Sequence, residues 1–257
     1  MDALALLDVA VEAAHRAGAL LLERFAAPAT GIETKTSPTD VVSDADRASE
    51  RLLMDLLASE RPDDGVVGEE GARRPSRSGV RWVVDPLDGT VNYLYGIPAW
   101  CVSIAAEDDD GGVAGVVFDP SRDETFAAAR GHGARLNGTE VRVSERTELS
   151  AALVATGFGY DAGLRAAQGQ VVARVLPRVR DVRRGGSAAL DLVSVACGRV
   201  DAFYEAHMNP WDRAAGQLVV REAGGVVTEL RDPTGVSDGV VAGPRALHDR
   251  LRVLVDP

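Results

Sequence analysis

The segment at residues 80–90 joins a short apolar run to two acidic residues, and no other part of the chain constrains the fold as tightly. Residues 80–84 are apolar, which is typical of a short buried strand. The strand is expected to deliver Asp85 at its end, because Pro86 fixes a turn there. Asp85 and Asp88 are three residues apart and are expected to leave this turn on the same side. The sequence therefore predicts a strand that ends in two carboxylates.

The residues after these acids predict an anion-binding backbone. Gly89 lets the main chain approach a ligand closely, and Thr90 stands where a helix or tight turn would begin. The N–H groups of Asp88, Gly89 and Thr90 can then face one anion. Carboxylates alone would repel that anion, so the pattern favours hard, oxygen-seeking cations between them. In the alternative interpretation Asp85 and Asp88 merely cap a surface turn, which suits an isolated acid pair better than the restrictive string W-V-V-D-P-L-D-G-T.

Three further acidic sites extend the prediction. Glu69 follows a short apolar run, Asp40 and Asp46 flank the expected start of a helix, and Asp212 lies in the first turn of another helix. Each site alone is more typical of a helix cap or of a solvated acid. Together with Asp85 they indicate a shared metal site.

The order of the expected elements predicts a layered α/β architecture, because strands and helices alternate along the second half. The 257 residues suit one unit over residues 1–257, with an α+β half at about 1–145 and an α/β half at about 146–257. A turn is expected at Ser37-Pro38 and an exposed loop at 71–79. Helices are expected at 3–25, 43–60, 162–176, 187–196, 211–223 and from 245. Strands are expected at 80–84, 100–106, 113–118, 124–129, 141–143, 153–156, 200–204, 226–230 and 239–242.

The charge of the chain limits its partners. A formal charge of −11 disfavours non-specific nucleic-acid binding, which needs a basic face. The same charge opposes an anionic substrate unless bound divalent cations reverse the local sign. Lys35 is the only lysine, and it lies near the acidic motif at residues 39–46.

The apolar pattern predicts neither a secretory signal nor a membrane span, so a cytoplasmic location without membrane partners is expected. Cys101 and Cys197 lie far apart in apolar surroundings and are expected to be buried free thiols in a reducing cytosol. Two isolated cysteines and four scattered histidines do not make a zinc site.

With these motifs in place, the sequence resembles the inositol monophosphatase family of metal-dependent phosphatases over almost its whole length. The matching elements are W-V-V-D-P-L-D-G-T-V-N-Y at 82–93, P-W-D-R-A-A-G at 210–216, Glu69, Lys35 with residues 39–46, the turn at 131–138, and R-G-G-S-A-A-L-D-L at 184–192. The resemblance implies an αβαβα sandwich of the inositol monophosphatase and fructose-1,6-bisphosphatase type, a homodimer, two to three Mg²⁺ ions per site, and inhibition by lithium. Ser43 and Gly71 depart from residues common in relatives, but neither is a ligand.

The resemblance also implies roles for individual residues. A first ion would be held by Glu69, Asp85 and the carbonyl of Leu87. A second would be held by Asp85, Asp88 and Asp212, with a weaker third ion near Glu69. Thr90, hydrogen-bonded to Asp46, would orient the attacking water, and Glu69 would assist. The resemblance further implies two auxiliary residues, Lys35 and Asp40. The residues that it implies for substrate binding are Asp88, Gly89, Thr90, Ser187, Ala188, Glu205 and Asp212.

The substrate is expected to be a small phosphate monoester, with inositol 1-phosphate first. In inositol-directed relatives an acid at the position of Glu205 accepts hydrogen bonds from ring hydroxyls. Histidinol phosphate is the alternative, because the same acid could pair with an amine. Fructose 1,6-bisphosphate and 3′-phosphoadenosine nucleotides are further alternatives on this fold, for which Arg183 and Arg184 are the obvious basic candidates. A non-enzymatic alternative is a regulatory binding protein with vestigial catalysis.

Overall fold

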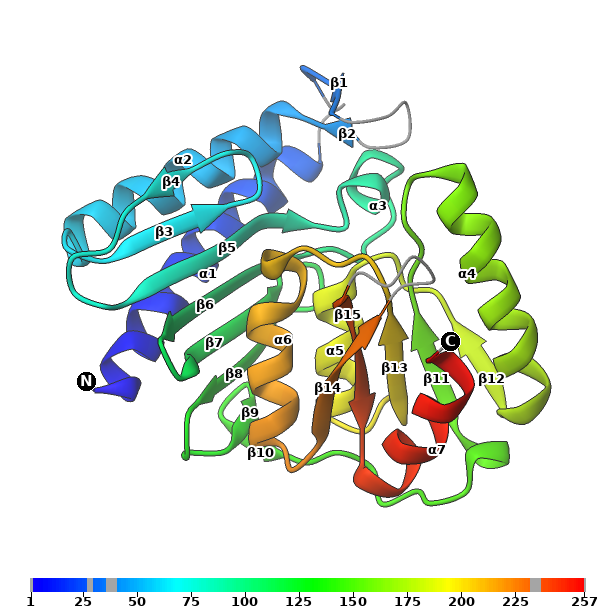
Figure 1. Ribbon diagram of the computed structural model, residues 1–257. Helices are drawn as coiled ribbons and strands as arrows, with labels where there is room; N and C mark the ends of the chain where they lie inside the picture. The colour runs from blue at the N-terminus through cyan, green and yellow to red at the C-terminus, as the bar shows by residue number, and fades with distance from the viewer. Residues whose placement is uncertain (1, 27–29, 36–40, 232–236, 257) are drawn as a thin grey trace.

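The structure is a computed structural model that describes residues 2–26, 30–35, 41–231 and 237–256 (Figure 1). Within these residues, helices and sheets alternate in five layers. An eight-stranded sheet lies between one helix pair and a central pair, and a five-stranded sheet lies between the central pair and an outer pair. The three pairs are α1 (Ala3–Phe25) with α2 (Asp44–Glu60), α5 (Ala188–Ala196) with α6 (Pro210–Glu222), and α4 (Ala162–Val175) with α7 (Arg245–Val255). This is the predicted αβαβα sandwich.

The larger sheet is antiparallel except for one parallel pairing, between β3 and β5. Its strands, in spatial order, are β10 (Thr139–Val141), β9 (Ala134–Leu136), β8 (Glu124–Ala129), β7 (Gly111–Asp119), β6 (Cys101–Asp108), β5 (Arg81–Asp88), β3 (Gly65–Gly68) and β4 (Arg73–Arg74). Strand β3 runs parallel to β5, so both deliver their following residues to the same edge. Glu69 after β3 and Asp85 in β5 therefore approach one another from neighbouring strands.

The smaller sheet combines a parallel and an antiparallel part. In spatial order its strands are β12 (Asp181–Arg183), β11 (Leu153–Thr156), β13 (Ala202–Glu205), β15 (Ser237–Gly243) and β14 (Val226–Arg231). The first three are parallel, whereas β15 is antiparallel to both of its neighbours. Shorter elements complete the fold: β1 (Glu33–Thr34) paired with β2 (Val41–Val42), α3 (Thr90–Leu94), and the 3₁₀ turns η1 (Leu149–Ala151) and η2 (Leu176–Arg178).

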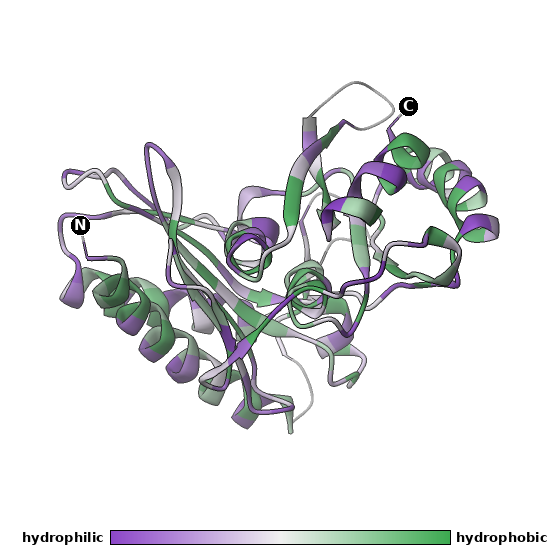
Figure 2. Ribbon diagram, turned by 90° about the horizontal axis from the view of Figure 1, so that it is seen from below, coloured by the Kyte–Doolittle hydropathy of each residue, from purple (hydrophilic) through white to green (hydrophobic). Residues whose placement is uncertain are grey.

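Helix α1 shows why the first layer packs closely. Asp2 caps its start by accepting hydrogen bonds from the N–H groups of Leu4 and Ala5. The buried face of the helix is rich in alanine, and a Cβ at Gly18 would come within 2.5 Å of the Phe118 ring on β7. Figure 2 shows the amphipathic pattern as green and purple bands along the helices beside the N-terminus. Small residues therefore let α1 lie against the sheet.

The central layer is held equally closely by small residues. A Cβ at Gly216 of α6 would lie 2.7 Å from the Leu192 side chain of α5, and a Cβ at Gly115 of β7 would lie 3.2 Å from Ala215. Both approaches are tighter than ordinary van der Waals contact, so the absent side chains permit the packing. Helix α6, which carries Asp212 in its first turn, is thereby fixed against both α5 and the larger sheet.

The structure differs from the sequence-based expectations in detail. Strand β5 continues to Asp88 and does not stop at residue 84, and the loop expected at 71–79 contains the short strand β4. Cys101 is buried as expected, but Cys197 is only partly buried, so the prediction of two buried thiols was wrong for that residue. The turn expected at Ser37-Pro38 lies outside the described residues. In the described part of the chain, no helix combines the length and apolar character needed to cross a membrane.

Candidate active site

A bulge at the end of β5 creates the first part of the site. Asp85 pairs with Ser103 of β6, and Asp88 pairs with Cys101, so the two acids are three residues apart while their partners are two apart. The extra residue bends the strand locally. Asp85 Oδ1 accepts a hydrogen bond from the Leu87 N–H at 3.0 Å, which fixes the turn. The predicted pair of carboxylates thus lies on a strand end stabilised by its own backbone.

Gly89 connects this bulge to α3. Its φ of +96° lies in the left-handed region, where a side chain is disfavoured. A Cβ there would also lie only 3.0 Å from the carbonyl oxygen of Ala99. Helix α3 begins at Thr90, in agreement with the predicted start of a helix or tight turn. A glycine is therefore required at this position on two independent grounds.

Thr90 and Asp46 are joined as the family resemblance implied. The Thr90 hydroxyl donates to Asp46 Oδ1 at 2.9 Å, and Asp46 Oδ2 accepts from the backbone N–H of Ser43 at 2.8 Å and from its hydroxyl. Burial raises the pKa of Asp46, and its hydrogen bonds with Ser43 and Thr90 offset part of that rise. The Ser43–Asp46 capping box that starts α2 therefore also holds a polar group of the site.

A cavity of about 520 Å³ collects the predicted residues from both sheets. Its wall includes every described residue that the sequence assigned to the site except Asp46, which lies behind Thr90. Asp40, assigned an auxiliary role, lies outside the described residues. The predicted residues that line the cavity are Lys35, Glu69, Asp85, Leu87, Asp88, Gly89, Thr90, Ser187, Ala188, Glu205 and Asp212.

Four carboxylates dominate the electrostatics of this cavity. Burial, followed by the charges of Glu69, Asp88 and Asp212, raises the pKa of Asp85 well above its usual range. Burial and the charges of Glu69 and Asp88 do the same for Asp212. Burial raises the pKa of Asp88 to about 6. Buried acids that repel one another in this way are stabilised by a cation.

The donor set fits a hard cation, but the carboxylates also have partners within the protein. Asp88 Oδ2 accepts from the Ser187 hydroxyl at 2.6 Å and from the Ala189 N–H at 2.7 Å. Asp212 Oδ2 accepts from the Asn209 N–H at 2.6 Å. Among the described residues, no three His, Cys, Asp or Glu side chains converge into a metal-ligand cluster. Gathering these oxygens on one ion therefore requires side-chain rotation, whereas the main chain already brings them to one cavity.

Lys35 supplies a positive charge at one side of the cavity. Its Nζ lies 2.8 Å from Glu69 Oε1 and 2.7 Å from Glu70 Oε1. Burial opposes the charge on Lys35, but Glu69 and Glu70 outweigh it, and its pKa is raised. Burial raises the pKa of Glu70 to about 7 despite the bond with Lys35. The single lysine of the chain is thus placed directly against an expected metal ligand.

Glu205, the last residue of β13, contributes to the cavity from the smaller sheet. A Cβ at Gly157 would lie within 2.2 Å of both of its carboxylate oxygens, so Glu205 fills the space that this glycine leaves. Burial, followed by the charges of Asp191 and Asp88, raises the pKa of Glu205 to about 8. Burial and Asp88 raise the pKa of Asp191 to about 7. This part of the cavity therefore holds two carboxyl groups, Glu205 and Asp191, whose pKa values are close to neutral pH.

His207 is a wall residue that the sequence reasoning missed. It has a φ of +68°, which is unusual for a residue with a side chain. Its Nδ1 lies 2.8 Å from Asp238 Oδ2, and its N–H donates to Asp238 Oδ1 at 2.9 Å. The position of His207 in the sequence, between Glu205 and Asp212, could have indicated that it lies near the site. No sequence signal indicated its contact with Asp238, which lies on β15.

Comparisons with known proteins agree with this geometry. The family model described as the inositol monophosphatase family matches residues 2–256. An inositol-1-monophosphatase from Mycobacterium leprae is 45% identical over 237 residues, which cover 88% of this chain and 81% of that protein. Nus factor SuhB from Escherichia coli K12 is 38% identical over 256 residues, covering 98% and 96%. The crystal structure of extragenic suppressor protein suhB from Bartonella henselae superposes with a TM-score of 0.91 at 38% identity, covering 98% of both chains.

Proposed function

The chain belongs to the inositol monophosphatase family, whose members are phosphatases, and we propose that it hydrolyses a small phosphate monoester, with inositol 1-phosphate as the preferred substrate. The observation that supports this proposal is that Glu69, Asp85, Asp88 and Asp212 line one cavity together with the Gly89–Thr90 backbone. Such a cavity is unfavourable for a phosphate unless cations are bound, and favourable once they are.

We propose Mg²⁺ as the cation, because every ligand in the set is an oxygen. Glu69, Asp85 and the Leu87 carbonyl would hold one ion, and Asp85, Asp88 and Asp212 another, with a third near Glu69. When bound, the ions would supply the charge that lowers the pKa of water and neutralises the phosphoryl oxygens. Lys35 already forms an ion pair with Glu69, so Glu69 would either bind Lys35 and the ion together or release Lys35 when the ion binds. We also propose that lithium inhibits the enzyme by binding to the same carboxylates.

Thr90 is proposed to orient the attacking water. Its hydroxyl proton is committed to Asp46 Oδ1 at 2.9 Å, and a weaker geometry at 3.1 Å places it near the Leu87 carbonyl. Because the proton points into the protein, a lone pair of the Thr90 oxygen remains to accept a hydrogen bond from water. Asp46 is buried and fixed by Ser43, so this orientation is preorganised.

The leaving group is proposed to lie between the start of α5 and the end of β13. Ser187 caps α5, and the backbone at Ala188 opens toward the same cavity as Glu205. A Glu205 carboxyl with a pKa near 8 can donate as well as accept at neutral pH, which suits a ring carrying several hydroxyls. A cationic amine would favour the ionised acid, which keeps histidinol phosphate as the second substrate candidate.

A release assay for inorganic phosphate tests the proposal. The purified chain is given inositol, amino-alcohol, sugar-bisphosphate and 3′-phosphoadenosine phosphates, each with Mg²⁺ and with EDTA. We expect Mg²⁺-dependent release that is fastest with inositol 1-phosphate. Equal rates with and without Mg²⁺ would contradict the metal proposal, and a clear preference for another phosphate would contradict the substrate proposal.

The name of the E. coli relative, Nus factor SuhB, favours a second candidate function as a regulatory binding protein. We propose this role as additional to catalysis, because the ligand positions are all occupied by oxygen donors. Capture of a specific partner from lysate by the metal-free chain, and equally by an Asp85→Asn variant, would separate binding from catalysis.

A homodimer in the cytoplasm is also proposed. Tyr95 and Ile97 are exposed apolar residues directly after α3 and are candidates for a subunit contact. Light scattering of the wild-type chain and of a Tyr95→Ser, Ile97→Ser variant would test this assignment.

A further inference from the structure

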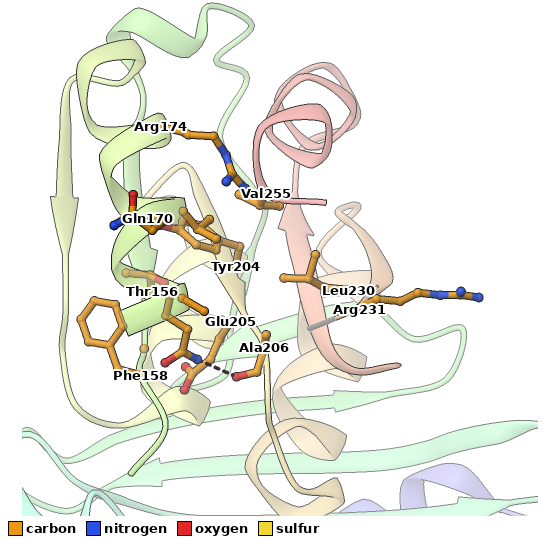
Figure 3. Close-up of a pocket in the computed structure, with 14 residues that line it drawn as sticks. Thr156, Phe158, Gln170, Arg174, Tyr204, Glu205, Ala206, Leu230, Arg231 and Val255 are labelled. Carbon is orange, nitrogen blue, oxygen red and sulfur yellow. Dashed lines mark hydrogen bonds between the residues drawn. The ribbon is translucent and has the colours of Figure 1, made fainter. Parts of the chain in front are cut away.

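A second cavity, of about 230 Å³, lies on the other face of the smaller sheet (Figure 3). One side of α4 forms a wall through residues such as Ala167 and Val171, and the ends of β11, β13 and β14 form the floor. Val255 of α7 closes the far side. Ligands of α/β proteins commonly bind where parallel strands end, which is where this cavity lies.

The pleat of β13 separates this cavity from the proposed active site. Neighbouring residues on a strand point to opposite faces. Tyr204 packs in the hydrophobic core formed with α4 and α7, while Phe203 packs in the core shared with α5 and α6. Gln168 completes the partition, because its side chain accepts from the Gly159 N–H and donates to the Ala206 carbonyl. The two cavities share only the wall made by Gly157, Phe158 and Glu205.

Tyr204 places a polar hydroxyl group in the wall of a largely apolar cavity. The residue is only 4% exposed, and its hydroxyl makes no hydrogen bond of good geometry. The Thr156 side chain is close enough to affect its pKa, but burial is the larger influence and raises it. A buried hydroxyl without a partner is unfavourable, so a ligand that supplies an acceptor would be stabilised here.

Arg174 gives the cavity a charge preference. It lines the mouth, and its Nε donates to the Leu254 carbonyl at 3.2 Å (Figure 3). Within the described residues it forms no ion pair with a carboxylate. Arg174 and Tyr204 line the same cavity, and the charge of Arg174 offsets part of the rise that burial causes in the pKa of Tyr204. The acceptor that suits both groups is a carboxylate.

The volume sets the size of the ligand. An apolar cavity of about 150 Å³ in another protein binds benzene. A cavity of 230 Å³ with mainly aliphatic and aromatic walls is therefore large enough for one or two fused rings. Larger molecules would have to displace Gln168 or Val255.

We propose that this cavity is a second ligand site, distinct from the phosphatase site, for a small hydrophobic ring compound that carries one carboxylate. The ring lies against Val171, Leu230 and Val255, and the carboxylate lies between the Tyr204 hydroxyl and the Arg174 guanidinium. Since Gly157 and Glu205 belong to both cavities, an occupant contacts the back of the wall that holds the leaving group. The site therefore does not depend on which phosphate the enzyme hydrolyses.

Binding of indole-3-carboxylate and of uncharged indole to the whole chain tests the proposal, with calorimetry and ¹H–¹⁵N NMR as readouts. We expect the carboxylate to bind more tightly than indole. Tyr204→Phe should weaken the carboxylate about 3- to 10-fold, the value of one neutral hydrogen bond. Arg174→Gln should weaken it about 2- to 5-fold, as for an exposed ion pair. Neither change should alter the affinity for indole.

Three controls decide between this cavity and other sites. Ala167→Phe should fill the space and remove binding of both probes, while Arg165→Gln, a neighbour on α4 outside the cavity, should leave both unchanged. Phosphate with Mg²⁺, at concentrations that saturate the phosphatase site, should not displace either probe. Displacement by phosphate, binding that ignores Ala167→Phe, or no binding at millimolar probe would each overturn the proposal. Retained hydrolysis of p-nitrophenyl phosphate by every variant confirms that each is folded.

Discussion

Thr90 and Asp46 are 44 residues apart in the sequence, yet the Thr90 hydroxyl donates to Asp46 Oδ1 over 2.9 Å. The bond connects the start of α3 to the first turn of α2. It therefore links the strand end that carries Asp85 to a helix in the outer layer. Because Asp46 is also held by Ser43, the position of the Thr90 oxygen is set by two capping interactions and not by the cavity itself.

Replacing Thr90 by valine should lower kcat by about 100-fold or more, the lower range for a group that positions a proton-transfer partner. Valine keeps the shape of the side chain but removes the hydroxyl, so KM should change little. The measurement is steady-state hydrolysis of inositol 1-phosphate. Thr90→Ser restores the hydroxyl and should restore most of the rate. A serine variant as slow as the valine variant would show that packing, and not the hydroxyl, is responsible.

Asp85→Asn should abolish Mg²⁺-dependent hydrolysis and weaken Mg²⁺ binding while the fold is retained. In the proposed arrangement Asp85 contacts both ions, so the loss of its charge should affect both; burial, followed by the charges of Glu69, Asp88 and Asp212, raises its pKa. In EDTA the variant should be more stable than wild type, because a buried acid among other acids is replaced by a neutral amide. Calorimetry with Mg²⁺ and thermal unfolding measure both effects. Asp109→Asn, at an exposed hairpin tip, is the matched control, and near-wild-type turnover in Asp85→Asn would contradict the metal assignment.

The metal-free chain should lose stability as pH rises from about 4 to 8. Glu205 and Asp191 have pKa values of about 8 and 7 in the folded chain, whereas unfolded acids titrate near 4. Between these limits the folded state holds protons that the unfolded state has released, so the free energy of unfolding falls with rising pH. A loss of at least about 1.4 kcal/mol is expected, the value of one pKa unit.

Urea unfolding in EDTA across this pH range measures the slope. Glu205→Gln cannot titrate and should flatten the curve. A free energy of unfolding that rises between pH 4 and 8 would show that these acids are not held in their protonated form.

Glu205 should govern substrate choice and leave the basic rate of hydrolysis unchanged. It reaches the cavity from β13 of the smaller sheet, whereas Glu69 follows β3 of the larger sheet, and it contacts the leaving group in the proposed arrangement. Because the pKa of Glu205 is about 8, its carboxyl is mainly neutral at pH 7, and the loss of a neutral hydrogen bond costs about 0.5–1.5 kcal/mol. Glu205→Gln and Glu205→Ala should therefore lower kcat/KM for inositol 1-phosphate by about 2- to 10-fold. Hydrolysis of p-nitrophenyl phosphate, which offers no hydroxyls, should stay near wild type. Equal losses with both substrates would instead assign Glu205 to the metal site.

Elements with a strong internal pattern could be predicted from the sequence. The start of α1 at Asp2, strand Glu124–Ala129 and strand Leu153–Thr156 were predicted closely, because capping, alternation and flanking turns are local signals. The strands β4, β9 and β12 were not predicted. Each has only two or three residues, which is too short for a recognisable sequence pattern. Such strands form because they pair with a neighbouring strand. We also propose that the boundary between the N-terminal and C-terminal halves lies near residue 145, because the larger sheet ends before this residue and the smaller sheet begins after it.

The candidate site divides in the same way. Its acids could be predicted because motifs around Asp85 and Asp212 are contiguous strings. The direction of the Asp88 side chain could not, because it depends on the donors Ser187 and Ala189 at the start of α5, about a hundred residues away. The double ion pair of Lys35 and the His207–Asp238 contact likewise depend on the fold as a whole.

The close approach of Gly216 to Leu192 shows that the motif at residues 210–216 meets two separate requirements. Asp212 is needed for the proposed chemistry, whereas Gly216, one helical turn later, is needed so that α6 can lie against α5. A descendant that abandoned hydrolysis for a binding role would be free to change Asp212, but it would still require the glycine to fold. Gly216 therefore reports membership of this architecture, and Asp212 reports activity. Sorting related sequences by these two positions would distinguish enzymes from relatives that retain only the scaffold.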